Sequence, residues 1–462
     1  MRRPAESGVL VPAALVLLAA SVTMLARVWE GDLSSDEVLY AAVAKRMAVG
    51  GGWLDPQLGD APYWKKPPLV FWLLGLAFRL IGISSFSARL VPAVFGVLTC
   101  VVLYLVGRRL VGERTALIGA LVLATTPRFV RVAAHVNLDT AIALLTLVSL
   151  LPFVRAAPAA PGPRGAAVTG AAWGLALMAK SLFGLLGAYA MLVYLAAHRR
   201  LRFLASAAFL VAVLVAAAVA LPWHVHAILR SGPDFVRTYL GQEVVARMTG
   251  HIAYAERHVY LRELLRDDWP WIAFTAIGIA VGLRRAREDG NVLFLIAWPV
   301  GYFLLLHLSA FRAGKYLVHL YAPAALLAAM GIEAVLPRRW LAHVLPATAV
   351  LVVASGLVLI LVPFPLRRPT ARHVKDLGPA LDRLGAQPGA PLFGYRVHDD
   401  VRASSLVYLD RDIHNHELDE IPHAGAAVVV VDRRLSDSVA GAGFVEVYRN
   451  ERYALFGASS RP

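Results

Sequence analysis

The chain has 462 residues, 58% of them apolar, with 46 basic against 31 acidic residues and a formal charge of +15. Uncharged apolar runs of about 18 residues or more recur along it, which excludes an ordinary soluble domain and indicates a membrane protein with several spans. Most basic residues lie in short loops between these runs, so the charge indicates membrane orientation and not nucleic-acid binding. The single cysteine, Cys100, excludes an intrachain disulfide.

The first apolar run, residues 8–26, follows Arg2 and Arg3. It is long, lacks a small-x-small cleavage site and is followed by further runs, so we predict a retained first helix and not a signal peptide. A polar loop, residues 29–87, comes next. It is the longest polar segment in the first third of the chain.

Two short helices are predicted inside this loop. Residues 36–49 start with two acids and end before three glycines, which is typical of helix boundaries. Residues 67–82 are apolar but short for a span, so we predict a second juxtamembrane helix there. The helix predicted over 36–49 suits the membrane interface because it has an apolar side and a charged side. The apolar side is Val38, Ala42 and Met47, and the charged side is Glu37, Lys45 and Arg46.

Ten further spans are predicted after the loop. Every second connection between them is rich in arginine and falls on the side of the N-terminus, so the start of the chain is predicted in the cytoplasm and its tail outside. The fold class is therefore an all-α polytopic membrane helix bundle with about 11–13 transmembrane helices. The ten spans are at about 88–107, 115–130, 138–154, 165–180, 182–197, 202–228, 269–283, 291–309, 316–336 and 340–362.

The last hundred residues differ in kind, because long apolar runs stop and Pro, Arg and Asp become more frequent. We predict two domains: residues 1–362, a transmembrane domain that includes the loop 29–87, and residues 363–462, a small α/β domain outside the membrane. The predicted elements of the second domain are a helix over 371–385, strands over 390–397, 404–409 and 426–434, and a hairpin over 444–457.

Ionisable residues that are far apart in the sequence fall in loops on one predicted membrane face. They include Asp36, Asp139, Lys180, Arg247 and Lys315. A charge at the centre of a membrane helix costs about 2.5–3.5 kcal/mol, so charges at the ends of spans indicate a function. We predict an active site at the non-cytoplasmic surface.

Three acids have two interpretations each. Asp36 and Glu37 start a predicted helix and Asp139 starts a predicted span, so each could simply cap a helix. The functional interpretation is a carboxylate that orients an acceptor hydroxyl or amine, or takes its proton. Both interpretations remain open for these residues.

The basic residues suit a phosphate. Lys66 precedes two prolines that fix the backbone, although an interfacial lysine that reaches lipid headgroups is the alternative. Lys180, Arg247, Lys315 and the hydroxyl of Tyr316 complete a set of donors. Such donors would stabilise the charge that grows on a phosphate as a sugar–phosphate bond breaks.

At these residues the chain resembles the GT-C superfamily of polyprenyl-phosphate-sugar-dependent glycosyltransferases, most closely the bacterial lipid A aminoarabinose transferases and the protein O-mannosyltransferases. The resemblance covers roughly residues 30–330, and its opening loop is the specific part. The matching stretches are DEVLY (36–40), GGWLDPQLGDAPYWKKPPLVFWL (51–73), ARLVPAVFGVLT (88–99), GRRLVGER (107–114), LD (138–139), LMAKSLFG (177–184), EVVARMTG (243–250) and GKYLVHLYAPAALL (314–327).

The resemblance implies a helix bundle with a periplasmic catalytic cavity, often a periplasmic C-terminal domain, and inverting transfer of a sugar from an undecaprenyl-phosphate carrier. The implied acceptor is periplasmic, such as lipid A, another glycolipid or a protein, and the implied location is the bacterial inner membrane. By position, Asp36 resembles the catalytic acid and Asp139 the second acid; Lys66, Arg247 and Tyr316 resemble the contacts of the carrier phosphate, and Lys180 a further pocket lysine.

The chain departs from the family at two positions associated with a bound zinc. The aminoarabinose transferases have Glu before the lysine of KPP, where this chain has Lys65, and a His shortly before the loop arginine, where this chain has Val244. We therefore predict no metal and no other cofactor, which metal analysis of the purified protein would test. Leu39 replaces a family arginine, so acceptor contacts are also expected to differ.

Two other functions stay open on the sequence. A transporter or flippase of lipid-linked sugars would need polar groups at mid-membrane depth and symmetry between the halves, and neither is evident. A non-catalytic envelope scaffold is the third candidate. The acids and bases at the matched positions favour the enzyme, a hexosyl- or pentosyltransferase whose partners are the polyprenyl-phosphate sugar, its acceptor and membrane lipids.

Overall fold

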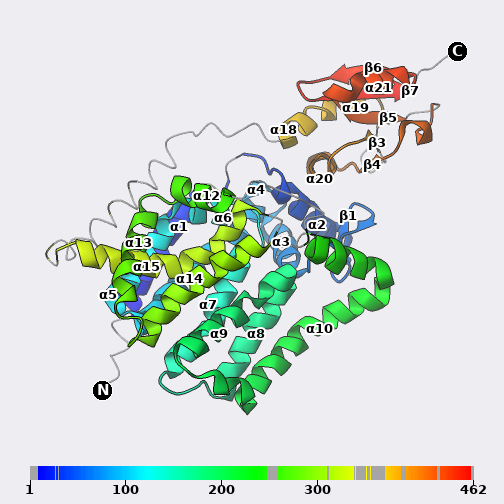
Figure 1. The fold of residues 1–462 in the computed structure, drawn as a ribbon. Coiled ribbons are helices and arrows are strands. Elements are labelled where there is room, and N and C mark those ends of the chain that lie inside the picture. Colours follow the sequence, from blue (N-terminus) through cyan, green and yellow to red (C-terminus); the bar gives the residue numbers. More distant parts are fainter. Residues whose placement is uncertain are drawn as a thin grey trace. The chain divides into compact units, whose positions relative to one another are not determined.

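The computed structural model describes residues 9–26, 28–29, 31–246, 249, 258–309, 312–337, 339, 350, 354, 370–386, 392–423 and 427–458 (Figure 1). These residues form two compact units. The first comprises the described residues of Met1–Val28, Trp64–Val70 and Arg89–Pro363, and the second those of Trp29–Tyr63, Phe71–Ala88 and Phe364–Pro462. The predicted first loop therefore groups mainly with the last hundred residues, whereas the prediction assigned it to the membrane domain.

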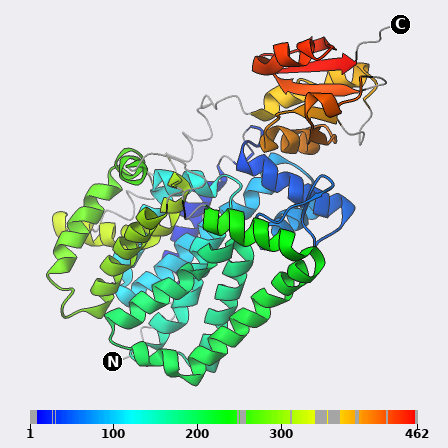
Figure 2. The ribbon, with the colours of Figure 1, turned by 45° about the vertical axis from the view of Figure 1, so that its right-hand side comes forward.

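The first unit is a bundle of α-helices, seen from two directions in Figures 1 and 2. Its α-helices are α1 (Leu10–Leu25), α4 (Ser85–Leu110), α5 (Glu113–Thr125), α6 (Pro127–Ala133), α7 (Asp139–Ala156), α8 (Pro163–Lys180), α9 (Leu186–Ala197), α10 (Ala207–Val236), α12 (Val259–Asp267), α13 (Trp271–Leu283), α14 (Gly290–Leu308) and α15 (Tyr321–Val335). They are joined by 3₁₀-helical segments at η2 (Ser181–Leu185), η3 (Leu201–Ala205) and η5 (Gly314–Leu320), and by a π-helical segment at η4 (Arg237–Ala246).

The described helices confirm a polytopic membrane protein. By length and composition, six helical segments can cross a membrane, or seven if the bent pair α5 and α6 is one span. The six are Ser85–Leu110, Asp139–Ala156, Pro163–Ala197, Ala207–Ala246, Gly290–Leu308 and Gly314–Val335. Three shorter apolar helices, α1, α3 (Leu69–Ile81) and α13, lie below that length, and the predicted span 340–362 lies almost wholly outside the described residues.

Small residues allow the helices of this bundle to approach closely. A Cβ added to Gly278 of α13 would come within 1.8 Å of the carbonyl oxygen of Leu327 on α15, and one added to Gly331 within 2.1 Å of that of Phe274. The two backbones therefore touch through reciprocal glycines, a common way for membrane helices to associate when lipid is as apolar as the side chains.

One predicted span and one predicted loop differ in the structure. The predicted span 115–130 is broken at Thr126, where α5 and α6 meet at 64°. The predicted loop 229–268 is helical over much of its described part, because α10 continues through a kink at Gly232 into the π-helical η4 and α12 follows. Gly232 has a φ of 56°, which is not helical but which glycine adopts readily, so one helix ends there and a second begins after the kink.

The part of the second unit before residue 89 contains α2 (Asp36–Gly50), a hairpin of β1 (Gln57–Leu58) and β2 (Ala61–Pro62), and most of α3. Both predicted helices of the loop are thus present. The charged side of α2 is not all exposed, however. Glu37 is only 4% exposed, and Lys45 donates to the carbonyls of Leu406 (2.9 Å) and Val407 (2.8 Å).

The C-terminal part of this unit is an α/β sandwich built on one mixed sheet. Its strand order is β4-β3-β5-β7-β6, with β3 parallel to β4 and β5, and β7 antiparallel to β5 and β6. The strands are β3 (Leu392–Tyr395), β4 (Ile413–Asn415), β5 (Val428–Asp432), β6 (Phe444–Arg449) and β7 (Tyr453–Ala458).

Helices cover both faces of this sheet. Val428 and Val430 face the core made with α18 (Thr370–Lys375), α19 (Gly378–Arg383) and α20 (Asp399–Tyr408), whereas Val429 and Val431 face the core that includes α21 (Ser436–Gly441). A strand buried on both faces reads as a continuous apolar run, which is why β5 was predicted correctly.

The predicted strand over 404–409 is wrong, because these residues lie in and just after α20. A short apolar run has no period of its own that separates strand from helix. The deciding signal comes earlier: the side chain of His398 accepts from the backbone N–H of Asp400, and two aspartates occupy the first turn of the helix. The predicted helix over 371–385 is two short helices, α18 and α19.

Candidate active site

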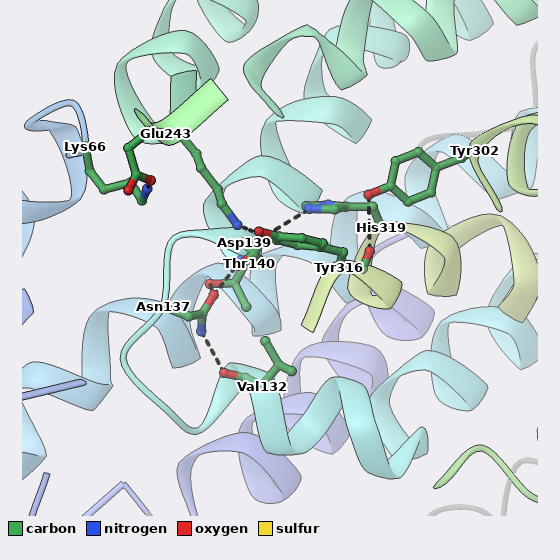
Figure 3. Close-up of polar contacts among 10 residues, drawn as sticks. Lys66, Val132, Asn137, Asp139, Thr140, Glu243, Tyr302, Tyr316 and His319 are labelled. Atoms are coloured by element: carbon green, nitrogen blue, oxygen red, sulfur yellow. Dashed lines mark hydrogen bonds and ion pairs between the residues drawn. The ribbon is translucent and has the colours of Figure 1, made fainter. Parts of the chain in front are cut away.

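The first unit contains a buried polar cluster centred on Asp139 (Figure 3). Asp139 is the first residue of α7 and is 2% exposed. Its Oδ1 forms an ion pair with the ammonium of Lys180 and lies 3.1 Å from Nε2 of His319. Two groups from other helical segments therefore converge on one carboxylate oxygen, and the structure brings together two of the predicted site residues.

The start of α7 is capped by another residue. The side-chain oxygen of Asn137 accepts from the backbone N–H of Thr140 at 2.9 Å, and its amide donates to the carbonyl of Val132 at 2.7 Å. The capping interpretation of Asp139 therefore loses its main support, since Asn137 accepts from a backbone N–H at the helix start and the carboxylate of Asp139 pairs with Lys180.

Lys180 is held at the cluster by a reversal of the chain. It ends α8, and Ser181 follows with a φ of 50°. η2 then returns along α8, so closely that a Cβ on Gly184 would lie 2.4 Å from the backbone nitrogen of Leu177. The predicted turn at Lys180 is thus present, and it depends on a glycine that leaves room for the returning backbone.

Aromatic rings border the ammonium of Lys180. Its Nζ lies 4.7 Å from the ring centroid of Phe183 and 4.8 Å from that of Tyr316, both within the range of a cation–π interaction. Tyr316 is 5% exposed, and its backbone carbonyl accepts from the hydroxyl of Tyr302 at 3.2 Å. The predicted phosphate contact Tyr316 therefore lies beside the predicted pocket lysine.

A second ion pair joins Lys66 to Glu243, and Figure 3 shows it to one side of the Asp139 cluster. Lys66 follows the β1–β2 hairpin and Glu243 lies in η4, so the pair links segments that are 177 residues apart. The charge of Lys66 also acts on Lys180. A phosphate that binds Lys66 has to compete with this carboxylate.

Lys315 belongs to the same group of charges, because its ammonium acts electrostatically on both Asp139 and Lys180. Of the four predicted phosphate-binding cations, Lys66 and Lys315 are therefore each close enough to Lys180 to interact with it. The fourth, Arg247, lies outside the described residues.

Asp36 and Glu37 lie in the second unit, at the start of α2. Glu37 accepts from the backbone N–H of Ser34 at 3.2 Å, the contact expected of its capping interpretation. Asp36 is half-buried. Catalytic roles for both stay predictions.

The zinc-associated family positions hold Lys65 and Val244, neither of which is an ordinary zinc ligand at neutral pH. Among the described residues, one group of three carboxylate and imidazole side chains comes close enough to share an ion: Asp60, Asp412 and His414. Arg402 donates to Asp412 at 2.6 Å and to Asp60 at 3.1 Å, so a guanidinium already offsets part of the negative charge of that group. Metal independence stays a prediction.

Two residues of the candidate site, Glu243 and His319, were not predicted, although both lie in stretches that carry the resemblance. His319 is three residues after Tyr316 in a 3₁₀ segment, where positions three apart face the same way. That spacing is a signal that could have found it. Glu243 carried no comparable signal, because its partner Lys66 is distant in sequence.

Comparison with known proteins supports the resemblance. Residues 65–226 match the family model described as dolichyl-phosphate-mannose-protein mannosyltransferase. The chain is 29% identical, over 302 residues, to the undecaprenyl phosphate-alpha-4-amino-4-deoxy-L-arabinose arabinosyl transferase of Erwinia tasmaniensis, a match that covers 64% of this chain. It covers 54% of that relative, so the chain spans about half the length of the curated relatives it matches.

The fold has a counterpart among solved structures. The structure of ArnT from Cupriavidus metallidurans bound to undecaprenyl phosphate superposes with a TM-score of 0.80 over 99% of both chains, at 18% identity. The oligosaccharyltransferase AglB from Archaeoglobus fulgidus superposes with a TM-score of 0.61 over 97% of this chain and 74% of its own, at 15% identity. The chain thus has the GT-C fold and resembles, in sequence and structure, the polyprenyl-phosphate-sugar glycosyltransferases, in particular the aminoarabinose transferases.

Proposed function

We propose that this protein is an inverting glycosyltransferase that moves a sugar from an undecaprenyl-phosphate or similar polyprenyl-phosphate carrier to an acceptor at the outer surface of the bacterial inner membrane. The acceptor is a glycolipid such as lipid A, or a protein. The observation that carries the proposal is the gathering of Lys66 and Lys315 around Lys180, whose ammonium lies beside Tyr316 at the end of α8.

The proposed reaction forms one bond and breaks one. The acceptor oxygen or nitrogen attacks the anomeric carbon, the carbon–oxygen bond to the carrier phosphate breaks, and the polyprenyl phosphate leaves with the bonding electrons. The lysines and the hydroxyl of Tyr316 stabilise the charge that develops on the leaving phosphate, a kind of interaction that contributes most where water is excluded. On the resemblance, Asp36 takes the proton of the acceptor.

Asp139 has a different role in this proposal. Its carboxylate is already engaged by Lys180 and His319, so we assign it to positioning: it fixes the ammonium of Lys180 beside Tyr316 and reduces the repulsion among the lysines. A carboxylate in such a place holds a cation ready for the phosphate without touching the reacting sugar.

The direct test supplies membranes with a radiolabelled undecaprenyl-phosphate sugar and extracts lipids and proteins as acceptors. Transfer of label to either acceptor supports the proposal. Asp36→Asn is expected to abolish transfer and to leave binding of undecaprenyl phosphate largely unchanged. Transfer at the wild-type rate in this variant would contradict the role of Asp36.

The Lys66–Glu243 pair gives a sharper test, because its two members should act in opposite directions. Lys66→Ala removes a charged contact and is expected to weaken binding of undecaprenyl phosphate about tenfold or more. Glu243→Gln removes the competitor and is expected to strengthen it. Lys65→Ala is the matched control. Equal weakening by the first two variants would mean that Lys66 and Glu243 act as a structural pair.

A further inference from the structure

The first unit contains an apolar cavity of about 190 Å³ that lies away from the Asp139 cluster. Side chains from α5, α12, α13, α14 and α15 line it, among them Val122, Ile279, Phe303 and Ala324. Apolar cavities of about 150 Å³ stay dry and accept a molecule as large as benzene, so this cavity has room for a length of hydrocarbon chain.

The cavity lies beside the surface that faces lipid. Two of its lining residues on α14, Val300 and Leu304, are 43% and 62% exposed, as apolar side chains on the outside of a membrane bundle are. A molecule that occupies the cavity can therefore enter from the bilayer, whose interior consists of hydrocarbon chains.

One polar atom of the lining is left without a partner. Asp268, 3% exposed, accepts from the hydroxyl of Tyr321 through Oδ2 at 2.9 Å, while its Oδ1 is buried and makes no hydrogen bond among the described residues. The other polar side chains of the lining are satisfied internally: Thr126 donates to Val122 at 2.8 Å, Thr275 to Trp271 at 2.9 Å. A buried carboxylate oxygen of this kind costs free energy unless a donor reaches it.

The charges around Asp268 indicate which donor fits. Burial raises the pKa of this carboxyl to about 6, so at neutral pH the oxygen is mostly an ionised acceptor. The surrounding ion pairs are already balanced between three cations and three anions, so a neutral donor fits better than a further cation. The cations are Arg128, Arg131 and Arg266, and the anions are Glu263, Asp267 and Asp268.

We propose that this cavity binds a membrane amphiphile whose hydrocarbon chain fills the apolar part and whose hydroxyl group donates to Oδ1 of Asp268. The site is separate from the proposed transfer reaction and does not depend on it. The apolar run 340–362 of the same chain is a weaker candidate for the occupant of the cavity. The end of that run that is predicted to lie on the same side of the membrane as Asp268 is residues 356–362. None of these residues has a side-chain hydrogen-bond donor.

The test uses the full-length protein in nanodiscs and a photoreactive long-chain primary alcohol. Labelling is expected on peptides of α13 and α14 and is expected to saturate. Decan-1-ol should compete at about a tenfold lower concentration than 1-methoxydecane, because only the alcohol can donate a hydrogen bond and one such bond is worth about that factor.

Four variants assign the two parts of the site. Ala324→Phe fills the cavity and should abolish labelling; if it does not fold, Ile279→Trp fills the same space from α13. Asp268→Asn should reduce the preference for the alcohol over the ether. Asp267→Asn, the adjacent carboxylate that pairs with Arg128, is the matched control and should keep that preference.

Three results would overturn the proposal. Equal competition by alcohol and ether in the wild-type protein excludes recognition of the hydroxyl. Unchanged labelling in both cavity-filling variants places the probe elsewhere. An absence of saturable labelling in the wild-type protein means that protein fills the cavity, either residues 340–362 or a second copy of this chain.

Discussion

The ion pair between Asp139 and Lys180 makes each charge depend on the other for its stability inside the bundle. The side chains are 3% and 8% exposed, so Asp139→Asn leaves a buried ammonium without its counter-charge, and Lys180→Met leaves a buried carboxylate. Breaking a buried pair from one side costs about 3–5 kcal/mol, whereas removing both charges together is often nearly neutral. We expect the double variant to be more stable than the sum of the single effects by at least about 2 kcal/mol.

The measurement is a double-mutant cycle on unfolding of the detergent-solubilised protein, followed by tryptophan fluorescence in graded denaturant. The pair Arg114–Glu333 also links two helices but is 55% and 21% exposed, so its cycle is the control and should show coupling below about 1 kcal/mol. Additive single effects at Asp139 and Lys180, or losses no larger than those of the control, would refute the reasoning.

The same double variant separates structure from chemistry. If it is stable and still transfers sugar, neither charge is needed for the reaction and the pair is structural. If it is stable and inactive, at least one of the two charges takes part in the reaction.

Three further predictions concern other parts of the chain. The pKa of Asp268 is raised to about 6 from 3.8, so the stability that this carboxyl contributes is complete below pH 3.8 and is lost as the pH rises through 6. Relative to Asp268→Asn, the free energy of unfolding of the wild-type protein should therefore fall by about 1 kcal/mol between pH 5 and pH 7 in thermal or denaturant unfolding. A pH-independent difference between the two proteins would contradict this prediction. Gly184→Ala places a Cβ 2.4 Å from the backbone of Leu177, which should destabilise the fold by about 1–3 kcal/mol and lower the melting temperature. Lys45→Ala removes two hydrogen bonds to the last carbonyls of α20. It should lower the free energy of local opening of that helix by about 1–2 kcal/mol, which is measured as faster amide hydrogen exchange.

The sequence predicted those elements whose signal is local. Gly50, Gly51 and Gly52 end α2 as predicted, and the run of valines in β5 and the hairpin of β6 and β7 needed only strand patterns and a polar turn. The helix α20 was missed because the capping by His398 lies outside the apolar run that suggested a strand.

The sequence identified some residues of the site but not how they pair. Charges at the ends of apolar runs identified Asp139 and Lys180, because such positions are costly without a function. Nothing in the sequence could show that these two residues neutralise each other or that Glu243 engages Lys66, since both pairs are made by helices that meet only in the folded bundle.

The second unit has a consequence for biosynthesis. Its first loop and its last hundred residues complete one another: α2 packs on α20, and the carboxylate of Asp32 bonds the ammonium of Lys375 at 2.5 Å. A ribosome synthesises α2 long before α20, although domains generally fold in the order of synthesis. The segment that carries Asp36 therefore cannot complete its packing until α20 has been synthesised, and a nascent chain arrested before residue 370 should leave that segment open to protease.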